Sequence, residues 1–519
     1  MIRQRSLVSL LAVVAACATT HGAVVPAPGA APADSREPKV ALREAIDSLA
    51  DVPEFSNAHW GILVVDPESG DTLYSRNAGK LFLPASNMKI VTSAVALEQL
   101  GPDFTYRTAF VIRAPVRDGT LVGDLSVVGR GDPTISDHMW GDAMVPLRAV
   151  AESLATHGIK RIAGRLVTAG DAFPGPVLGY GWSWDDLEDS YSAGVDELLF
   201  NEGFTEIRVR AGDAPGDSVR IETHPTRFSP LLRLAVTTVA APSCPTATDS
   251  LPPPPCAASA DGTAPRRRPP LTVRKDTLRG DVIVSGSIIA GDSVTLELTH
   301  RDPDLAYLAA LLEALTERGI IVDSGAVAPD SAARPDTLFT LSSKPLREIL
   351  PALMKPSQNQ IAEALLRTLG LERAGAGTAD SGRKVVERQL AQWGVPPASY
   401  VIRDGSGLSR YDYLTPEAIV HVLDAVRRSA NFQLYYDALP IAGVDGTLRS
   451  RMHGTPAEGN VHAKTGSVAN ARSLSGFVRT VDGRLLIFSV LSNNWTVPAT
   501  AVTRVQDAIA ARLASLRLR

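Results

Sequence analysis

The sequence predicts an α+β protein in which helices pack on an antiparallel sheet, with a mostly β insert interrupting this arrangement. Three observations lead to this fold class. Two short stretches, 59–65 and 72–76, flank a run of turn-forming residues, which is typical of an antiparallel pair of strands. Helical spacing of apolar residues dominates from about residue 344 onward. Related polar segments around Ser86 and Ser357 lie so far apart that a long insert must leave the domain and return.

The composition is that of a soluble globular protein with several domains. The chain has 519 residues, of which 45% are hydrophobic and 21% are charged. The net charge of −4 provides no argument for binding nucleic acid. We interpret the one basic cluster, residues 266–268, as a solvated loop because prolines flank it. No Cys-x-x-Cys or His-Glu-x-x-His pattern occurs, so we expect no metal and no organic cofactor.

The first 23 residues are expected to be a secretory signal. A basic start precedes an apolar run at residues 7–16, which is too short to span a bilayer. The residues before Cys17 resemble the cleavage box of bacterial lipoproteins, which would leave Cys17 lipidated. The alternative is ordinary cleavage near Ala23. Either way, we expect the protein in the periplasm or cell envelope.

The expected domain organisation follows from shifts in composition. We expect a signal peptide at 1–23, an Ala- and Pro-rich tether at 24–38, the first part of the sheet-and-helix domain at 39–105, inserted domains at 106–335, and the second part at 336–519. Within the insert, residues 241–270 form a Pro-rich loop. Cys244 and Cys256 lie within this loop, on either side of a run of prolines, and either a disulfide or two free thiols would fit an exported protein.

The first part of the domain begins with a helix at 42–49. Strands at 59–65 and 72–76 flank a turn at 66–71 that is rich in turn-forming residues. This hairpin leads into a helix that starts near Ser86.

The insert is expected to contain short strands and two helices. The strands are predicted at 106–112, 120–128, 161–167, 206–211 and 218–222, with further strands starting near 271, 281 and 293. The helices are predicted at 147–157 and 305–318.

The second part returns to longer elements. Helices are predicted at 346–354, 361–369, 382–393 and 500–516, and strands at 461–465, 473–480 and 485–491. Asp482 and Gly483 have the composition of a hairpin turn. Ser357 is expected to begin a helix directly after Pro356.

Three short motifs carry the predicted chemistry. Ser86 and Lys89 are three residues apart, which places both side chains on one face of a helix. A serine hydroxyl needs a base beside it, and a lysine serves when burial lowers its pKa. Alone, this spacing also fits any buried helix start. A Ser-x-Asn pair at Ser357 and Asn359 and a Lys-Thr-Gly run beginning at Lys464 follow in the expected order, which favours an active site.

With these motifs, the chain resembles the class C low-molecular-mass penicillin-binding proteins, which are D-alanyl-D-alanine carboxypeptidases and endopeptidases. Further segments carry the resemblance, at 129–134, 404–409 and 442–448. The resemblance implies a transpeptidase-like domain interrupted by two mostly β domains. The chain departs from the family pattern at Gln358, where an aspartate is usual, and at Asn87. Gln358 need not touch the substrate, and Asn87, in place of a small hydroxyl residue, is the milder departure.

The resemblance also implies a mechanism on peptidoglycan stem peptides, with β-lactams as inhibitors. Ser86 would attack the penultimate D-alanine carbonyl, Lys89 would take its proton, Ser357 would relay a proton to the leaving amine, and Asn359 would orient substrate and Lys89. Lys464 would add positive potential, and Thr465 would contact the terminal carboxylate. The backbone N–H groups of Ser86 and Ser467 would form an oxyanion hole beside Gly466. Two alternatives remain, a β-lactamase and a peptidoglycan-binding protein with little activity.

Other residues have less certain assignments on sequence alone. The family places an aspartate of the insert at the cleft mouth, facing a diamino acid side chain, and the matching residue is Asp186. An exposed loop acid is the alternative. The segment 404–409 and the segment 445–447 carry turn residues that either shape turns or line the cleft. His462 lies on the same strand face as Lys464, and we expect it to be a variable strand residue.

Overall fold

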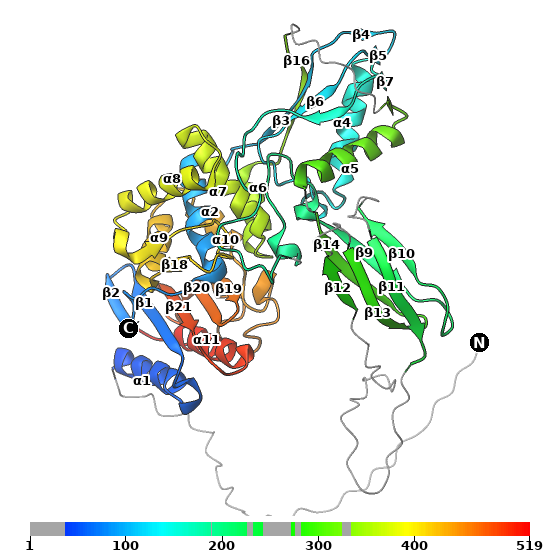
Figure 1. Ribbon diagram of the computed structural model, residues 1–519. Helices are drawn as coiled ribbons and strands as arrows, with labels where there is room; N and C mark the ends of the chain where they lie inside the picture. Colours follow the sequence, from blue (N-terminus) through cyan, green and yellow to red (C-terminus); the bar gives the residue numbers. More distant parts are fainter. Residues whose placement is uncertain are drawn as a thin grey trace, which may run out of the picture. The chain divides into compact units, whose positions relative to one another are not determined.

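A five-stranded antiparallel sheet lies at the centre of the sheet-and-helix domain (Figure 1). Its strand order is β19 (His462–Val468), β20 (Ala471–Arg479), β21 (Leu485–Asn493), β1 (His59–Asp66) and β2 (Asp71–Arg76). The computed structural model describes residues 37–187, 189–225, 232–241, 271–275, 282–300, 302–323 and 334–518. The pairing of β1 with β21 joins segments from the two ends of the chain, as the predicted interruption requires.

Helices cover both faces of this sheet. On one face, α1 (Pro38–Ala50) and α11 (Ala499–Ala514) form a core with Ile62 and Val64 of β1. The intervening Leu63 belongs to the opposite core, because successive strand residues point to opposite faces. That second core contains α2 (Met88–Leu100), α6 (Leu346–Met354), α7 (Asn359–Ala374), α8 (Ala379–Gln392), α9 (Pro416–Arg427) and α10 (Phe432–Ala438).

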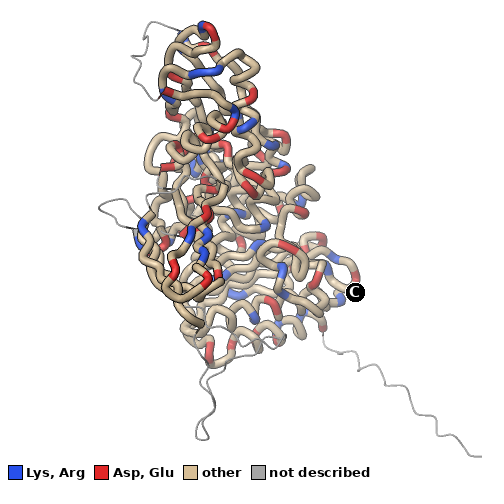
Figure 2. The backbone as a smooth tube through the Cα atoms, turned by 90° about the vertical axis from the view of Figure 1, so that its right-hand side faces the viewer, with Lys and Arg blue, Asp and Glu red and all other residues tan. Residues whose placement is uncertain are grey.

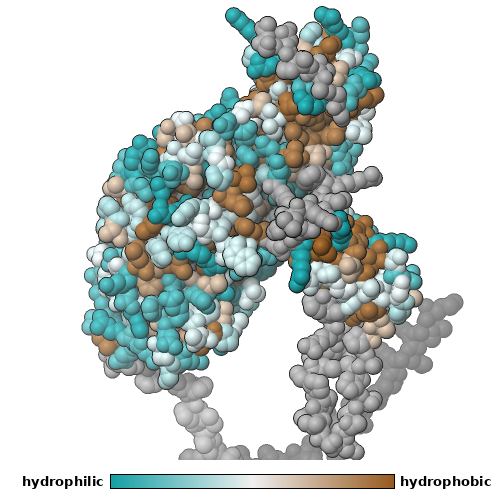
Figure 3. All heavy atoms as spheres, viewed as in Figure 1, coloured by the Kyte–Doolittle hydropathy of each residue, from teal (hydrophilic) through white to brown (hydrophobic). Residues whose placement is uncertain are grey.

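Helix α2 is buried at its start. Every residue from Met88 to Leu97 is buried, including Lys89. A helix that is apolar on all sides is expected inside a large core. In Figure 3, the surface over this domain is mostly hydrophilic with scattered hydrophobic spots, so its apolar residues lie largely in the two cores.

The first inserted unit combines two small sheets with two helices. One sheet has the order β16 (Asp336–Ser342), β3 (Arg107–Ile112), β6 (Leu125–Val128) and β8 (Leu166–Thr168). The other has the order β15 (Ile321–Val322), β7 (Arg161–Ile162), β5 (Thr120–Leu121) and β4 (Val116–Arg117). Helices α4 (Met144–Thr156) and α5 (Pro303–Glu317) share their hydrophobic core. The short helix α3 (Asp137–Trp140) precedes α4.

The second inserted unit is built from two three-stranded sheets. The first sheet has the strand order β10 (Arg220–His224), β9 (Phe204–Arg210) and β14 (Ser293–Thr299). The second has the strand order β11 (Leu232–Val239), β13 (Val282–Ile289) and β12 (Thr272–Lys275). Ile207 and Val209 of β9 pack with Val282 and Val284 of β13, so the two sheets share one small core. A two-stranded ladder of β17 (Tyr400–Val401) and β18 (Tyr413–Leu414) lies outside the insert.

The structure corrects several sequence predictions. The predicted strand 120–128 is divided by a bend at Gly123, and the predicted strand 161–167 is divided by a bend at Gly164. The two bends contact each other, since the Gly164 N–H donates to the Gly123 carbonyl. A Cβ at Gly164 would lie 2.6 Å from the carbonyl of Gly123, so only glycine allows this approach. Residues 336–342 were assigned to the second part of the domain with no strand predicted. They form β16, which pairs with β3 of the insert, so the insert extends to about residue 343. Strand β11 and helices α9 and α10 were not predicted.

Some predictions fall outside the described residues. These are the signal peptide, Cys17, nearly all of the tether, the Pro-rich loop beyond residue 241, and both Cys244 and Cys256. Among the helices that the structure does describe, none is long and apolar enough to cross a bilayer. Figure 2 shows acidic and basic residues interspersed along the described chain, in keeping with the small net charge.

Candidate active site

The turn before α2 presents Ser86. Residues 85–87 form a single 3-10 turn that continues into α2, and Ala85 adopts a left-handed backbone with φ of 47°. Lys89 lies in the first helical turn, and its Nζ donates a hydrogen bond to Ser86 Oγ at 2.8 Å. The structure therefore brings together the pair that the spacing predicted. A base in contact with a serine hydroxyl is the arrangement that activates a nucleophile.

Lys89 is held by two further contacts. Its Nζ donates to Asn359 Oδ1 at 2.6 Å and to the carbonyl of Ser406 at 2.8 Å. Burial lowers the pKa of Lys89 to about 7, while the nearby carboxyl groups of Asp404 and Glu363 oppose that shift. Near neutral pH a large fraction of Lys89 is therefore uncharged, as a general base must be.

A second lysine contacts the second serine. Lys464 Nζ, fully buried on β19, donates to Ser357 Oγ at 2.7 Å and to the carbonyl of Thr465 at 3.0 Å. Burial, and then the charge of Lys89, hold the pKa of Lys464 well below its usual range. Ser86–Lys89 and Ser357–Lys464 thus form two serine–lysine pairs.

Ser357 does not begin a helix, contrary to the prediction. Its φ of 70° is left-handed, which a helix cannot continue, and α7 starts at Asn359 instead. Gln358 is the N-cap, and its side-chain oxygen accepts a hydrogen bond from the Gln360 N–H at 2.9 Å. The side-chain amide of Gln358 also donates to Glu202 of the insert. Gln358 therefore caps the helix and contacts the insert, and it does not line the cleft.

The edge strand β19 forms one wall of the cleft. Thr465 Oγ1 donates to Thr447 Oγ1 at 2.7 Å. A Cβ on Gly466 would lie 3.0 Å from the backbone nitrogen of Ser86 and 2.8 Å from the Pro84 carbonyl. Only glycine lets the strand approach the nucleophile this closely. Because β19 ends the sheet, its outer edge is available for an extended peptide.

These residues surround one cleft of about 500 Å³. All the site residues named from the sequence line it except the two lysines, which lie buried beneath its floor. The lining residues from the sequence prediction are Ser86, Asp186, Ser357, Asn359, Thr465, Gly466 and Ser467. His462 is absent from the lining, and its ring stacks on Tyr436 at 3.9 Å.

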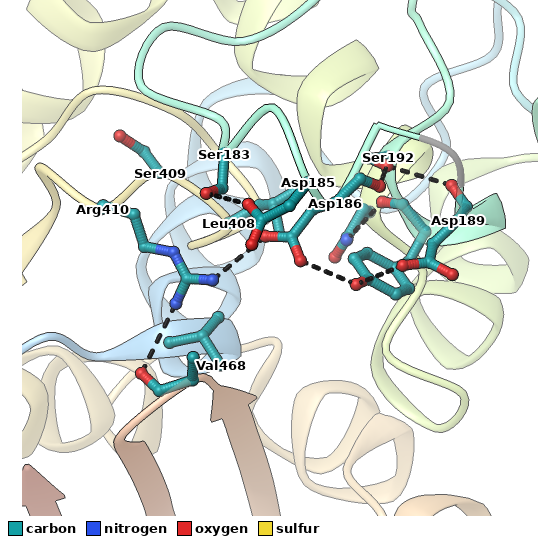
Figure 4. A network of polar contacts seen from close by, with 12 residues as sticks. Ser183, Asp185, Asp186, Asp189, Ser192, Leu408, Ser409, Arg410 and Val468 are labelled. Atoms are coloured by element: carbon teal, nitrogen blue, oxygen red, sulfur yellow. Dashed lines mark hydrogen bonds and ion pairs between the residues drawn. The ribbon is translucent and has the colours of Figure 1, made fainter. Parts of the chain in front are cut away.

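Asp186 belongs to a polar network at one end of the cleft (Figure 4). Its carboxylate pairs with Arg410 at 3.0 Å and accepts a hydrogen bond from the Tyr191 hydroxyl at 2.9 Å. The same hydroxyl donates to Asp189 at 2.7 Å, and the Tyr191 carbonyl accepts from the Asn359 amide at 2.6 Å. The insert thus contributes directly to the site. Sequence reasoning missed Tyr191 and Arg410 because no motif marks either residue.

The segment 404–409 both shapes a turn and lines the cleft. Asp404 accepts hydrogen bonds from the backbone of Gly407 at 2.6 Å and of Ser409 at 2.8 Å, which closes the turn. The turn presents the Ser406 carbonyl to Lys89, and Gly407 lies in the cleft wall. Trp182 of the insert donates to Asp404 at 2.8 Å. The segment therefore has both roles that the sequence left open, because it forms a turn and also lines the cleft.

The turn at 445–447 contacts Lys355, which lies two residues before Ser357 in the chain. Asp445 pairs with Lys355 at 2.6 Å, and the backbone N–H of Thr447 donates to the Lys355 carbonyl at 3.0 Å. Thr447 itself lines the cleft. This turn, like the previous one, is both a structural support and part of the wall.

Acylation by a β-lactam should accelerate as pH rises toward 7 and level off above it. Lys89 has to be neutral to accept the Ser86 proton, and its pKa is lowered to about 7. One pH unit below that value, the rate should fall to roughly a tenth, since only that fraction stays neutral. The second-order acylation rate by a fluorescent penicillin, measured between pH 5.5 and 8.5 with circular dichroism as a folding control, tests this. A flat profile would exclude Lys89 as the base.

Comparisons with known proteins cover nearly the whole described chain. A family model described as the D-Ala-D-Ala carboxypeptidase 3 (S13) family matches residues 42–252 and 257–516. The chain is 35% identical over 91% of its length to a D-alanyl-D-alanine carboxypeptidase of Actinomadura sp. (strain R39), covering 84% of that protein. It is 27% identical over 87% of its length to the D-alanyl-D-alanine carboxypeptidase DacB of Haemophilus influenzae, covering 88% of it.

Solved structures share the fold. The crystal structure of penicillin binding protein 4 from Haemophilus influenzae superposes with a TM-score of 0.73 at 23% identity, over 91% of this chain and 99% of that one. The same protein complexed with a β-lactam gives a TM-score of 0.68. The predicted α+β fold, a penicillin-binding domain with a long insert, is thereby confirmed.

Proposed function

Because the chain belongs to the D-Ala-D-Ala carboxypeptidase 3 (S13) family, we propose that it is a penicillin-sensitive serine D-alanyl-D-alanine carboxypeptidase that works through an acyl-enzyme on Ser86. The observation that carries this proposal is the contact of Ser86 Oγ with the buried Lys89, whose pKa is lowered to about 7. Peptidoglycan stem peptides are the substrates of such an enzyme, and β-lactams are its covalent inhibitors.

The proposed reaction begins with attack of Ser86 Oγ on the penultimate D-alanine carbonyl. Lys89 accepts the hydroxyl proton. The tetrahedral oxyanion lies between the backbone N–H groups of Ser86 and Ser467, and such donors typically lower the barrier by about 3–4 kcal/mol. Both residues line the cleft.

Collapse of the intermediate breaks the C–N bond and needs a proton on the leaving amine. Ser357 is suited to deliver it, because its hydroxyl contacts Lys464. Asn359 orients Lys89 through its Oδ1 atom. Lys464 contributes positive potential, and Thr465 is available to the terminal carboxylate. Water then hydrolyses the ester, which restores Ser86 and releases the shortened peptide.

Purified muropeptides test the function directly. Incubation followed by mass analysis should show loss of one alanine from pentapeptide stems, and cleavage of cross-linked dimers would add endopeptidase activity. A β-lactamase is the alternative enzyme, and rapid multiple turnover of penicillin without loss of alanine would favour it. A binding protein with little activity would leave both substrates unchanged. The intact contacts of the two serine–lysine pairs argue against that alternative.

Asp186 is proposed to recognise the amino end of a diamino acid side chain in the stem peptide. Its carboxylate lies in the cleft wall beside Arg410, so the two offer opposite charges at one place. A charge-assisted hydrogen bond to an ammonium there contributes about 1–3 kcal/mol. Asp186→Ala should therefore slow hydrolysis of stem peptides that carry a free amine by roughly tenfold.

Penicillin acylation is the internal control for Asp186→Ala, because penicillin lacks the amine. The acylation rate should stay close to that of the unmodified protein. Equal loss on both substrates would point to a folding defect, since Asp186 also holds Arg410 and Tyr191. No loss on either substrate would remove Asp186 from the binding site.

The protein is proposed to act outside the cytoplasm. The basic and then apolar N-terminus supports export, and the residues before Cys17 support a lipid anchor. Cell fractionation should find the protein in the envelope, and Cys17→Ser should move it from the membrane to the soluble fraction. A wild-type protein that is already fully soluble after lysis would contradict the lipid anchor but not export.

A further inference from the structure

A second cavity adjoins the catalytic cleft. It has a volume of about 710 Å³, larger than the cleft itself. Thr447 lines both, and Pro356 in its wall directly precedes Ser357 in the wall of the cleft. The other walls come from α3 of the insert, from α6 with its flanking residues and from the segment 445–449. The catalytic cleft and the second cavity are therefore adjacent and share Thr447 in their walls.

Strand β19 sets the direction in which a substrate lies. At the start of the cleft, Thr465 contacts Thr447. Past the end of the strand, the Ala469 carbonyl accepts a long hydrogen bond from Arg410 at 3.5 Å, and Arg410 pairs with Asp186. Gly466, opposite Ser86, lies between these ends.

The second cavity consequently lies on the leaving-group side. A stem peptide along β19 with its diamino acid side chain at the Asp186 end has its scissile carbonyl at Ser86. The part released by cleavage must then point toward Thr465 and Thr447. Beyond Thr447 it enters the second cavity.

The second cavity is lined by more basic than acidic side chains. Lys344 pairs with Glu348 at 3.1 Å, and Lys355 pairs with Asp445 at 2.6 Å. Arg347 pairs with Asp103. Arg449 is exposed, and no acidic partner for it occurs among the described residues. Its guanidinium remains available for an anionic ligand, and a carboxylate matches its geometry.

We propose that the second cavity holds the leaving chain of a cross-linked stem-peptide dimer, with Arg449 facing a carboxylate of that chain. A single leaving alanine ends at Thr465 and does not need a cavity of this size, which suits a much larger ligand. A leaving stem peptide is several residues long and carries carboxylates. The inference rests on the proposed function. Its new element is a binding site for the leaving chain, added to the endopeptidase reaction that the family resemblance implies for the same nucleophile.

The chemistry balances with the residues already described. Ser86 Oγ forms an ester with the D-alanine carbonyl of the donor chain. The C–N bond to the side-chain amine of the leaving chain breaks, and that amine takes the proton first removed from Ser86. Water then hydrolyses the ester and regenerates the hydroxyl. Only the identity of the leaving amine differs from the carboxypeptidase reaction.

Arg449→Glu tests the proposal. Three substrates are compared: a purified cross-linked muropeptide dimer, a monomeric pentapeptide stem and a fluorescent penicillin. Because reversal removes an attraction and adds a repulsion, kcat/KM on the dimer should fall on the order of tenfold. Arg449 does not line the catalytic cleft, so the other two rates should not change. Arg388→Glu makes the same charge change at an exposed residue of α8 that lines neither cavity, and it should leave all three rates unchanged.

A second arm uses a dimer whose leaving-chain carboxylates are amidated. The unmodified protein should cleave it about as slowly as Arg449→Glu cleaves the ordinary dimer, and the variant should lose nothing further. Equal rates of the variant and the unmodified protein on the ordinary dimer would overturn the proposal, as would an equal fall on all three substrates. A protein that trims pentapeptides but never cleaves dimers would also overturn it while leaving the proposed function intact. Failure to react with penicillin and pentapeptide alike would refute the proposed function itself.

Discussion

Ser86→Ala should abolish covalent labelling by a fluorescent penicillin and reduce alanine release from pentapeptide stems by about 10⁵-fold or more. The hydroxyl contacts Lys89 Nζ at 2.8 Å, and no other serine hydroxyl among the described residues contacts this Nζ atom. Removing the nucleophile therefore removes the covalent route entirely. Gel fluorescence and mass analysis of the intact protein measure the label.

Ser93→Ala is the matched control for this substitution. Ser93 lies one turn after Lys89 on the same helix, is buried, and donates its hydroxyl to the Lys89 carbonyl at 2.5 Å. It does not line the cleft, so its variant should still be labelled. Thermal unfolding of both variants would separate loss of chemistry from loss of fold. A label that persists in Ser86→Ala would mean that the nucleophile lies elsewhere.

Gly407→Ala should both destabilise the protein and slow acylation. Gly407 has a φ of 82°, and a Cβ there would lie 1.9 Å from the Ala85 carbonyl oxygen in the nucleophile turn. Either the 404–409 turn or the nucleophile turn must move, and the Ser406 carbonyl that holds Lys89 belongs to the former. We expect the free energy of unfolding to fall by about 2–4 kcal/mol. The acylation rate should fall at least tenfold, because misplacement of about 1 Å costs about a hundredfold.

Gly394→Ala separates backbone strain from the steric clash. Gly394 follows α8 with a φ of 78°, and a Cβ there would meet no atom within 4 Å. Its variant should lose only about 1 kcal/mol of unfolding free energy, from the left-handed backbone alone. Chemical denaturation of both variants gives the comparison. Equal losses in the two proteins would show that the contact with Ala85 is not tight, and unchanged acylation in Gly407→Ala would separate this turn from catalysis.

Much of the active site could be predicted from the sequence because its parts are local. The spacing of Ser86 and Lys89 decides that they share a helical face, and the structure brings them to 2.8 Å. Ser357, Asn359 and Lys464 belong to short motifs whose order along the chain is informative. Ser357 was placed in a helix wrongly, because a left-handed residue before an N-cap leaves no pattern in the residues around it. Tyr191 and Arg410 were missed because each acts through partners distant in the chain.

The sequence alone determined the α+β class, the interruption of the domain and the identity of the main polar groups. Periodicity is a local property, so it located β1, β20 and most helices, but it joined strands that bend at Gly123 and Gly164. Only the tertiary structure decided that β16 returns to the insert sheet, that the insert supplies Tyr191 and Asp186 to the cleft, and that Lys89 is buried enough to lower its pKa. Strand pairing and burial depend on contacts between distant segments, and those contacts exist only once the chain is folded.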